Sequence, residues 1–205
     1  MEAQIKVCQK RMKEKIIIIE GASYLRSNIQ WVQKLILLFY KIFNVVPFYE
    51  KEHEKWLKLI ENGKREITYF DWSGQIWPHV VNRTARRLAL FIKDKGPVKI
   101  ISTSLGTQIA IKATKHTSNI TKIVSLSGVY TPRPISIDFI DIYSTSDRFA
   151  NVFRCLLKFI AIYRRIKRRE VVLHNIRHDQ FRDNMRFMAG EFKGFTMSEL
   201  LNHFL

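Results

Sequence analysis

Cysteine is scarce in this sequence, and the residues missing around its cysteines exclude two kinds of site. Cys8 and Cys155 are the two cysteines among 205 residues, and they lie far apart in the chain. Neither has a second cysteine or a histidine at metal-ligand spacing, so the sequence predicts no disulfide framework and no zinc site. We therefore expect no metal and no cofactor, and a reducing, cytoplasmic location.

A long uninterrupted apolar stretch is also missing. The most apolar segment, residues 31–48, is interrupted by Gln33, Lys34, Lys41 and Asn44. A membrane-spanning helix needs about 20 consecutive apolar residues, and the charged residues that begin the chain lack the apolar core of a secretory signal. The segment therefore predicts a buried or interfacial helix.

Acidic residues are also scarce in comparison with basic ones. Asp and Glu number 18 against 35 Lys and Arg, which gives a formal net charge of +17. This charge attracts anionic partners without specifying a fold. The basic run at residues 163–169 follows an apolar stretch, so it predicts either a solvated helix end or peripheral contact with an anionic membrane. Nucleic acid is not expected as a partner, because no known binding motif accompanies the charge.

Short apolar runs alternate with amphipathic segments along most of the chain. The predicted strands are residues 15–20, 66–72, 98–103, 120–126, 137–143 and 171–174, and the predicted helices are one capped by Asn82 and residues 107–115, 152–163, 180–192 and 197–204. Strands that are apolar on both faces and alternate with helices are typical of a parallel sheet covered on both sides. The sequence therefore predicts an α/β fold, a mostly parallel twisted sheet with helices on both faces.

Chemistry in such a fold collects at the carboxyl ends of the strands. Ser104 directly follows the strand at 98–103, between the small residues Ser102 and Gly106. A strand, then small-x-Ser-x-Gly, then a helix is typical of a nucleophile elbow. Asp147 and His178 follow later strands, so a serine, an acid and a histidine lie at strand ends in that order.

Each of these three residues has an alternative. Ser104 could be an ordinary helix N-cap. The competing residues are Asp71, Asp138 and Asp141 for the acid and His174 for the base. We favour Asp147 because Asp138 and Asp141 lie within the predicted strand, and Asp71 can cap a turn. We favour His178 because it begins a loop. The remaining histidines, His53, His79, His116 and His203, are expected at the surface.

The elbow and the order Ser104, Asp147, His178 resemble the α/β-hydrolase superfamily, in particular its small lipase-like and esterase-like members. The resemblance covers about residues 15–184. It departs from the usual pattern at three positions: Ser102 replaces a glycine before the nucleophile, Glu20 a histidine before Gly21, and Arg177 a glycine before the base. The resemblance implies the minimal form of that fold in one domain, residues 1–205, with residues 22–64 as a helical insertion near the active site.

The resemblance also implies an activity, a serine hydrolase that cleaves carboxylic esters through an acyl-enzyme. Ser104 would be the nucleophile, His178 the general base and Asp147 the residue that orients it. The backbone N–H groups of Leu105 and Ala22 would form the oxyanion hole. The three departures keep a second interpretation open, a non-catalytic protein of this fold that binds a lipid or a protein partner.

Apolar side chains near the predicted site indicate the substrate. A helical stripe of Trp, Leu and Phe at residues 28–48 either packs in the core or walls an acyl pocket. The predicted pocket residues are Ser23, Trp72 and Phe149, with Val152 and Phe153 extending the wall after Phe149. We therefore expect a small-molecule or lipid ester with a hydrophobic acyl group.

Overall fold

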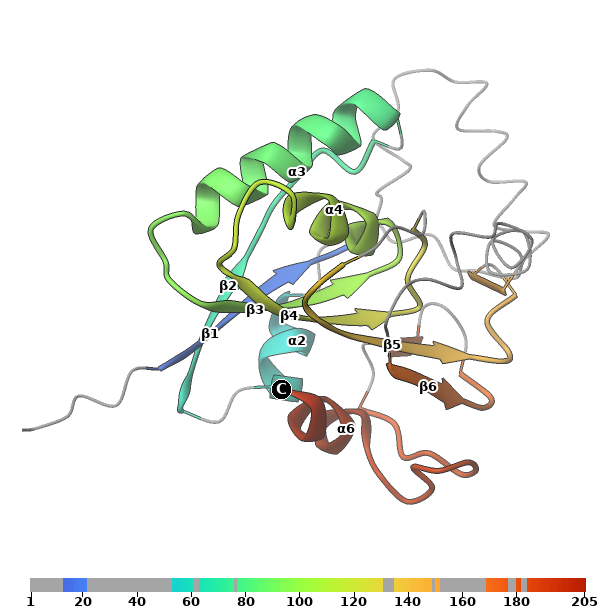
Figure 1. Cartoon of the computed structure of the whole chain (residues 1–205). Coiled ribbons are helices and arrows are strands. Elements are labelled where there is room, and N and C mark those ends of the chain that lie inside the picture. The colour runs from blue at the N-terminus through green and yellow to red at the C-terminus, as the bar shows by residue number, and fades with distance from the viewer. Residues whose placement is uncertain are drawn as a thin grey trace, which may run out of the picture.

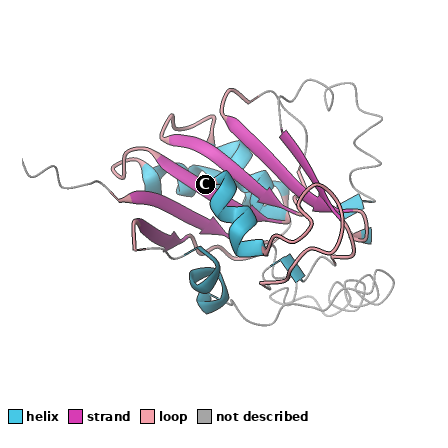
Figure 2. Ribbon diagram, turned by 90° about the horizontal axis from the view of Figure 1, so that it is seen from below, coloured by secondary structure: helices cyan, strands magenta, loops and turns pink. Residues whose placement is uncertain are grey.

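The computed structural model describes residues 13–21, 53–60, 63–75, 77–130, 135–148, 150–151, 169–176, 180–181 and 184–205. Six strands of these residues form one sheet in the order β2-β1-β3-β4-β5-β6, shown in Figures 1 and 2. The strands are β1 (Glu14–Ile19), β2 (Arg65–Tyr69), β3 (Val98–Thr103), β4 (Ile120–Leu126), β5 (Asp138–Ser144) and β6 (Arg169–Leu173). Every neighbouring pair is parallel, which confirms the predicted fold class.

Helices cover both faces of this sheet. They are α2 (His53–Ile60), α3 (Pro78–Ile92), α4 (Leu105–Ala113) and α6 (Met197–Phe204). Alternate residues of β1 point to opposite faces: Ile16 and Ile18 pack in the core with α2 and α6, while Ile17 and Ile19 pack in the core with α3 and α4. Figure 1 shows α3 and α4 on one side of the sheet and α2 and α6 on the other. Because the sheet packs against a core on each of its faces, its strands are continuous apolar runs in the sequence.

The helix predicted over residues 180–192 is wrong. The described part of this segment has 3₁₀ residues at 180–181, then irregular and turn residues over 184–192, with one isolated antiparallel bridge between Arg186 and Thr196. Gly190 has a φ of +86°, which a helix does not allow. Phe181 and Phe187 are buried in the core that they share with α2 and α6, and residues 184–187 are not helical. The apolar residues of this segment therefore contact a core built from elements far away in the chain, and they do not form one face of a helix. The helix predicted over residues 152–163 and the stripe at residues 28–48 lie outside the described residues.

The start of α3 also differs from the prediction. Asn82 is an exposed residue inside the helix, where its side chain accepts a hydrogen bond from Lys112. The helix begins at Pro78. Proline is favoured in the first turn of a helix because its missing N–H would have no partner there. A proline start therefore replaces the predicted asparagine cap.

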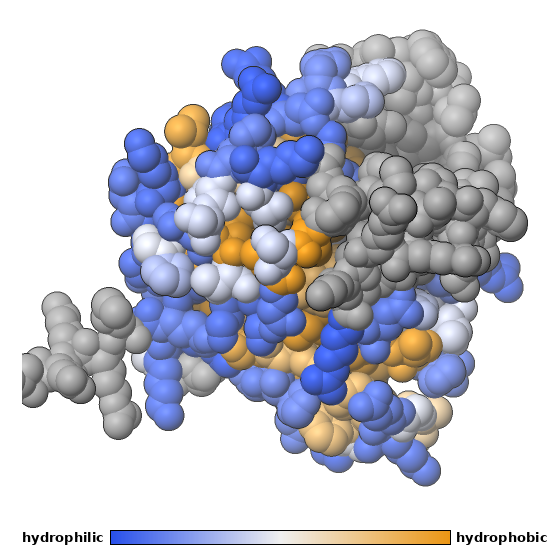
Figure 3. Space-filling model, in the orientation of Figure 1, coloured by the Kyte–Doolittle hydropathy of each residue, from blue (hydrophilic) through white to orange (hydrophobic). Residues whose placement is uncertain are grey.

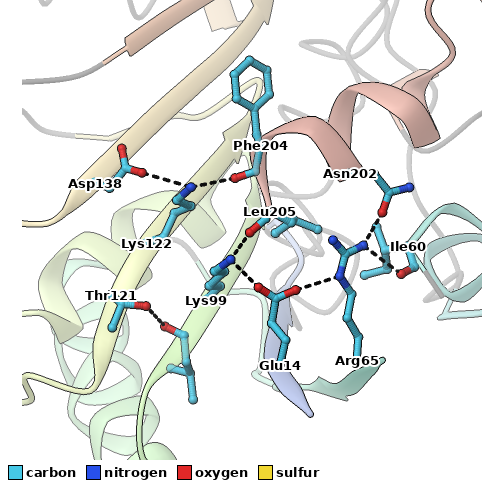
Figure 4. Close-up of polar contacts among 11 residues, drawn as sticks. Glu14, Ile60, Arg65, Lys99, Thr121, Lys122, Asp138, Asn202, Phe204 and Leu205 are labelled. Carbon is cyan, nitrogen blue, oxygen red and sulfur yellow. Dashed lines mark hydrogen bonds and ion pairs between the residues drawn. The ribbon is translucent and has the colours of Figure 1, made fainter. Parts of the chain in front are cut away.

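Charged side chains join the amino ends of the strands, as Figure 4 shows. The Glu14 carboxylate accepts a hydrogen bond of 2.8 Å from Arg65 Nε and also pairs with Lys99. Lys122 pairs with Asp138 at 3.1 Å and donates a 2.8 Å bond to the carbonyl of Phe204 in α6. Cations at the last carbonyls of a helix offset its negative end. The network therefore fastens α6 to the amino edge of the sheet.

Removing the Glu14 carboxylate is expected to lower the free energy of unfolding at neutral pH but not at acidic pH. Burial raises the pKa of Glu14, but hydrogen bonds and charges from Lys99 and Arg65 outweigh it and hold the pKa below its usual value. A depressed folded pKa stabilises the fold above the unfolded pKa of about 4.3, and this contribution is lost as pH falls through the folded value. We expect Glu14→Gln to lower the free energy of unfolding by about 1 kcal/mol at pH 7. Urea denaturation at pH 7 and pH 3 checks this, and an equal loss at both pH values would contradict it.

Candidate active site

The order of the strands marks one place at the carboxyl edge of the sheet. β1 lies between β2 and β3, so the chain first adds a strand on one side of β1 and then moves to the other side. In open parallel sheets, ligands bind outside the carboxyl ends of the strands at such a reversal. Gly21 follows β1 and Ser104 follows β3. The topology therefore places Ser104 where this fold class binds its ligands.

Ser104 has an unusual backbone conformation, with φ 46° and ψ −126°. This is close to the first central position of a type II′ turn, which glycine dominates. A non-glycine residue at such a φ is uncommon and strained. Ser104 occupies the N-cap position of α4, yet its side chain makes no capping hydrogen bond. Ser104 therefore does not cap α4 with its side chain, and the sharp turn has the strand-to-helix geometry that the predicted nucleophile elbow requires.

Hydrogen bonds from β4 and the residues that follow it hold this turn. The Ser104 N–H donates to the carbonyl of Leu126 at 3.2 Å. The Ser104 carbonyl accepts from the N–H of Thr107 at 3.1 Å and from the N–H of Val129 at 3.0 Å. Both backbone groups of the strained residue are thus bonded. A strained conformation persists where the surrounding structure determines it in this way.

Two glycines allow β1, the elbow and α4 to approach closely. A Cβ atom on Gly21 would lie 2.8 Å from the Cβ of Ser104. A Cβ atom on Gly106 would lie 2.5 Å from the carbonyl oxygen of Ile19 and 2.8 Å from that of Glu20. No side chain fits at these distances. Gly106 is one of the two small flanks that the sequence predicted.

Ser102, the other predicted flank, lies in a buried row of hydroxyl groups. Its Oγ is 3.1 Å from Thr107 Oγ1, which is 3.1 Å from Ser125 Oγ. All three side chains are buried. A buried hydroxyl is tolerated when it is hydrogen-bonded. The structure thus accommodates a serine where the family usually has glycine.

Asp147 is the buried carboxylate at the carboxyl edge of the described sheet. It lies just beyond β5 and is 1% exposed. Its Oδ1 accepts a 3.0 Å hydrogen bond from the N–H of Ala150, a helical residue just after it, as the side chain of a helix N-cap does. This bond fixes the carboxylate at the edge where the elbow lies, as its predicted role requires.

The three alternative acids lie elsewhere. Asp71 follows β2 and is exposed. Asp138 begins β5 and pairs with Lys122 at the amino edge, so it lies at the wrong end of the strand. Asp141 is buried within β5, where it accepts a 2.7 Å hydrogen bond from the hydroxyl of Tyr130. Of these four acids, Asp147 is the one that is both buried and at the carboxyl edge, and its catalytic role stays a prediction.

The predicted base, His178, lies outside the described residues, as does Arg177. The residues just before it are tied to the loop that carries Asp147. The N–H of Asn175 donates to Ser146 Oγ and that of Ile176 donates to Ser144 Oγ, each at 3.2 Å. The segment that leads to His178 therefore starts beside the acid loop. Neither serine was assigned a role from the sequence, although Ser144 ends β5 and Ser146 directly precedes the predicted acid.

His174, the alternative base, is exposed directly after β6. Its Nδ1 lies 3.2 Å from Thr145 Oγ1. The other predicted site residues divide into two groups. Leu105 begins α4 directly after Ser104, and Trp72 is buried, whereas Ala22, Ser23 and Phe149 lie outside the described residues. The oxyanion hole and the acyl pocket therefore stay predictions.

Two tryptophans anchor Glu20, the residue at which the chain departs from the family pattern after β1. The indole of Trp56, from α2, donates to Glu20 Oε1 at 3.0 Å. The indole of Trp72 donates to the carbonyl of Glu20 at 2.9 Å. The next residue, Gly21, donates its N–H to Thr103 Oγ1 at 2.9 Å. The turn after β1 is thus bonded to α2, to the end of β2 and to β3.

The Glu20 charge also acts on a neighbouring phenol. Burial, together with the negative charge of Glu20, raises the pKa of Tyr69 far above its usual value. Tyr69 ends β2 and packs against the core of α2 and α6. Tyr69 therefore stays neutral at physiological pH, and it is not available as a base there.

Replacing Trp56 by phenylalanine tests the anchoring of Glu20. The change keeps an aromatic ring in the core but removes the indole donor, so we expect the free energy of unfolding to fall by about 1–3 kcal/mol. Trp77→Phe is the matched control, because Trp77 is 48% exposed and its replacement should cost little. Urea denaturation measures both variants. Equal stabilities would show that the Trp56 bond to Glu20 contributes nothing.

The described residues contain neither a metal-binding cluster nor a membrane-spanning helix. Among them, no group of three or more His, Cys, Asp or Glu side chains is placed to hold a metal ion. Within the same ranges, no helix is both long enough and apolar enough to cross a membrane.

Comparisons with known proteins agree with this architecture. No protein-family model matches the chain, and no curated protein matches its sequence. Among solved structures, the chain is similar to ESTFA in an iron-lacking apo form, with a TM-score of 0.52 and 12% identity over 85% of this chain and 70% of that one.

Two further solved structures are similar at lower scores. One is a "putative hydrolase of the alpha/beta superfamily" from Xanthomonas campestris pv. campestris, with TM-score 0.44 and 12% identity over 82% of this chain and 90% of that one. The other is a "putative alpha/beta hydrolase" from Agrobacterium tumefaciens, with TM-score 0.43 and 16% identity over 83% and 78%. Identities this low concern the fold alone. With its six parallel strands and a strained serine after β3, the chain has the α/β-hydrolase fold.

Proposed function

We propose that the protein is a serine hydrolase that cleaves carboxylic esters with a hydrophobic acyl group. One observation carries the proposal: Ser104 is held at φ 46° and ψ −126° at the strand-order reversal, with no capping bond from its side chain. A strain of this kind costs about 1–3 kcal/mol and clusters at active sites. The position presents a hydroxyl above the sheet, as nucleophilic attack requires.

The proposed reaction has two halves. Ser104 Oγ bonds to the acyl carbon while His178 takes the hydroxyl proton, and the alcohol leaves with that proton. Water then attacks the acyl-enzyme with His178 as base, which releases the acid and restores Ser104. Asp147 would orient the imidazole and stabilise its charged form. The buried position of Asp147 after β5 supports this role.

The oxyanion hole in this proposal uses backbone N–H groups of Leu105 and Ala22. Leu105 begins α4, and the first N–H groups of a helix have no partner within it. Ala22 follows Gly21, whose N–H is bonded to Thr103. A turn fixed in this way favours preorganised donors, and losing one such donor typically costs about 10²–10³ in turnover. Ser23, Trp72 and Phe149 remain the proposed pocket residues.

Labelling with a fluorophosphonate tests the proposal directly. We expect peptide mass spectrometry to locate the adduct on Ser104, and we expect the label to disappear in His178→Ala. His174→Ala is the matched control, since this exposed histidine precedes the same loop and should leave labelling intact. Labelling that survives in His178→Ala and is lost in His174→Ala would reassign the base. A series of esters of increasing acyl length then tests the substrate class.

A non-catalytic protein of the same fold is the second candidate. The observation that favours it is Glu20, which places a carboxylate in the turn after β1, where an oxyanion would otherwise be stabilised by N–H groups. A negative charge near that position opposes the developing oxyanion. Folded protein that takes no fluorophosphonate label and hydrolyses no ester would support binding of a lipid or a protein partner. The cytoplasm stays the proposed location in either event.

A further inference from the structure

One face of α3 gathers positive charge on the outside of the molecule. We define the α3 basic face by its exposed residues at helical spacing: His79, Arg83, Arg86, Arg87, Leu90 and Lys93, the last just past the helix end. The opposite side of the helix, with Val81, Leu88 and Ile92, is buried against the sheet. α3 contains three arginines and no Asp or Glu. The helix is therefore amphipathic, and the charged residues within it are all basic. Asp94, an exposed acid, directly follows Lys93 just past the helix end.

The charges of this face are not neutralised within the described part of the protein. Among the described residues, no ion pair involves Arg83, Arg86 or Arg87. Lys115 and His116, just after the neighbouring helix α4, are exposed too. Figure 3 shows hydrophilic side chains covering the molecule where α3 lies in Figure 1. An unneutralised cluster of this kind attracts an anionic partner.

Exposed apolar side chains accompany these cations. Leu90 is 70% exposed between Arg87 and Lys93, and Trp77, at the start of α3, is 48% exposed. The apolar face of α3 is buried in the protein, so these two side chains are what the helix offers to a bilayer. Cations beside exposed Leu and Trp side chains suit a surface that has anionic headgroups above an apolar interior. A site that binds phosphate groups alone would not bury the exposed Leu90 side chain. From this combination we propose that the α3 basic face binds the surface of an anionic phospholipid bilayer.

The proposal does not depend on the proposed hydrolase activity. The buried side of α3 packs in the core with the sheet and α4, the helix that follows Ser104, so the α3 basic face points away from both. The arginines would attract anionic headgroups, and Leu90 would enter the boundary between headgroups and acyl chains. Each cation near such a surface contributes about 1 kcal/mol, which is about fivefold in affinity.

Co-sedimentation with phosphatidylcholine vesicles that contain phosphatidylserine tests the proposal. The triple variant Arg83→Gln, Arg86→Gln and Arg87→Gln is expected to lose about a hundredfold in affinity. The matched control carries Lys13→Gln, Lys58→Gln and Lys193→Gln, which are exposed residues away from α3. Both triples lower the net charge of +17 by three. Binding that falls equally in both, or that is absent in the unchanged protein, would overturn the proposal.

A single variant separates a bilayer from other polyanions. We expect Leu90→Ala to weaken vesicle binding about threefold to tenfold, because less apolar surface would be buried. Binding to a double-stranded oligonucleotide should not change. If the oligonucleotide binds as tightly as the vesicles and Leu90→Ala affects neither, the occupant is nucleic acid and the proposal fails. All variants should keep the circular dichroism spectrum and the urea midpoint of the unchanged protein, since alanine and glutamine are good helix formers.

Discussion

Replacing Ser104 by glycine is expected to abolish ester hydrolysis while leaving a fold more stable than that of the alanine variant. Both replacements remove the proposed nucleophile, so turnover should fall at least about 10³-fold in each. They differ in backbone freedom, because Ser104 has a φ of 46° that alanine tolerates poorly and glycine tolerates well. We expect Ser104→Gly to exceed Ser104→Ala by about 1–2 kcal/mol in free energy of unfolding.

Ester hydrolysis and urea denaturation of the two variants measure these effects. Ser118→Ala serves as the control for turnover, because Ser118 is an exposed residue before β4, at the opposite edge of the sheet. It should hydrolyse esters at the unchanged rate. If the glycine and alanine variants are equally stable, the serine is not strained. If either keeps full turnover, Ser104 is not the nucleophile. The two measurements therefore test the strain and the chemistry separately.

Replacing Gly106 by alanine is expected to destabilise the protein by about 2–4 kcal/mol. The new Cβ would lie 2.5 Å from the carbonyl oxygen of Ile19, a backbone atom in the centre of the sheet that has little room to move. β1 and α4 would have to separate, and the elbow lies between them. We therefore expect the labelling of Ser104 to weaken as well.

Gly63→Ala is the matched control for this variant. Gly63 has a φ of +68° and no atom within 4 Å of a Cβ placed on it, so its replacement costs backbone strain alone, about 1–2 kcal/mol. Urea denaturation should rank Gly106→Ala as the less stable of the two. The reverse order would mean that α4 shifts away from β1 at little cost.

The strands and the elbow could be predicted because their signals are local. The strands at residues 98–103 and 120–126 match β3 and β4, since continuous apolar runs bounded by polar residues are readable within one stretch of chain. The helix at 197–204 also matches α6, which Thr196 begins with a capping box. The small residues around Ser104 are equally local. Where the signal lies within a few residues, the sequence is sufficient.

Prediction failed where a pattern depended on distant partners. The segment at residues 180–192 was predicted as a helix, but its described residues are irregular from 184 onward, and Phe181 and Phe187 are buried in the core that they share with α2 and α6. The tryptophans that anchor Glu20 lie 36 and 52 residues away in the chain. The residues around Glu20 in the sequence indicate neither of these hydrogen bonds. Non-local contacts of this kind override propensity and periodicity.

By itself the sequence determined the α/β class, most of the strands and the serine at the elbow, because backbone conformation and apolar periodicity are properties of short segments. The tertiary structure decided the rest. It placed Ser104 at the strand-order reversal, put Asp147 at the same edge and Asp138 at the opposite one, and left the α3 basic face exposed. Those outcomes follow from the order in which parallel strands pair, which joins segments far apart in the chain.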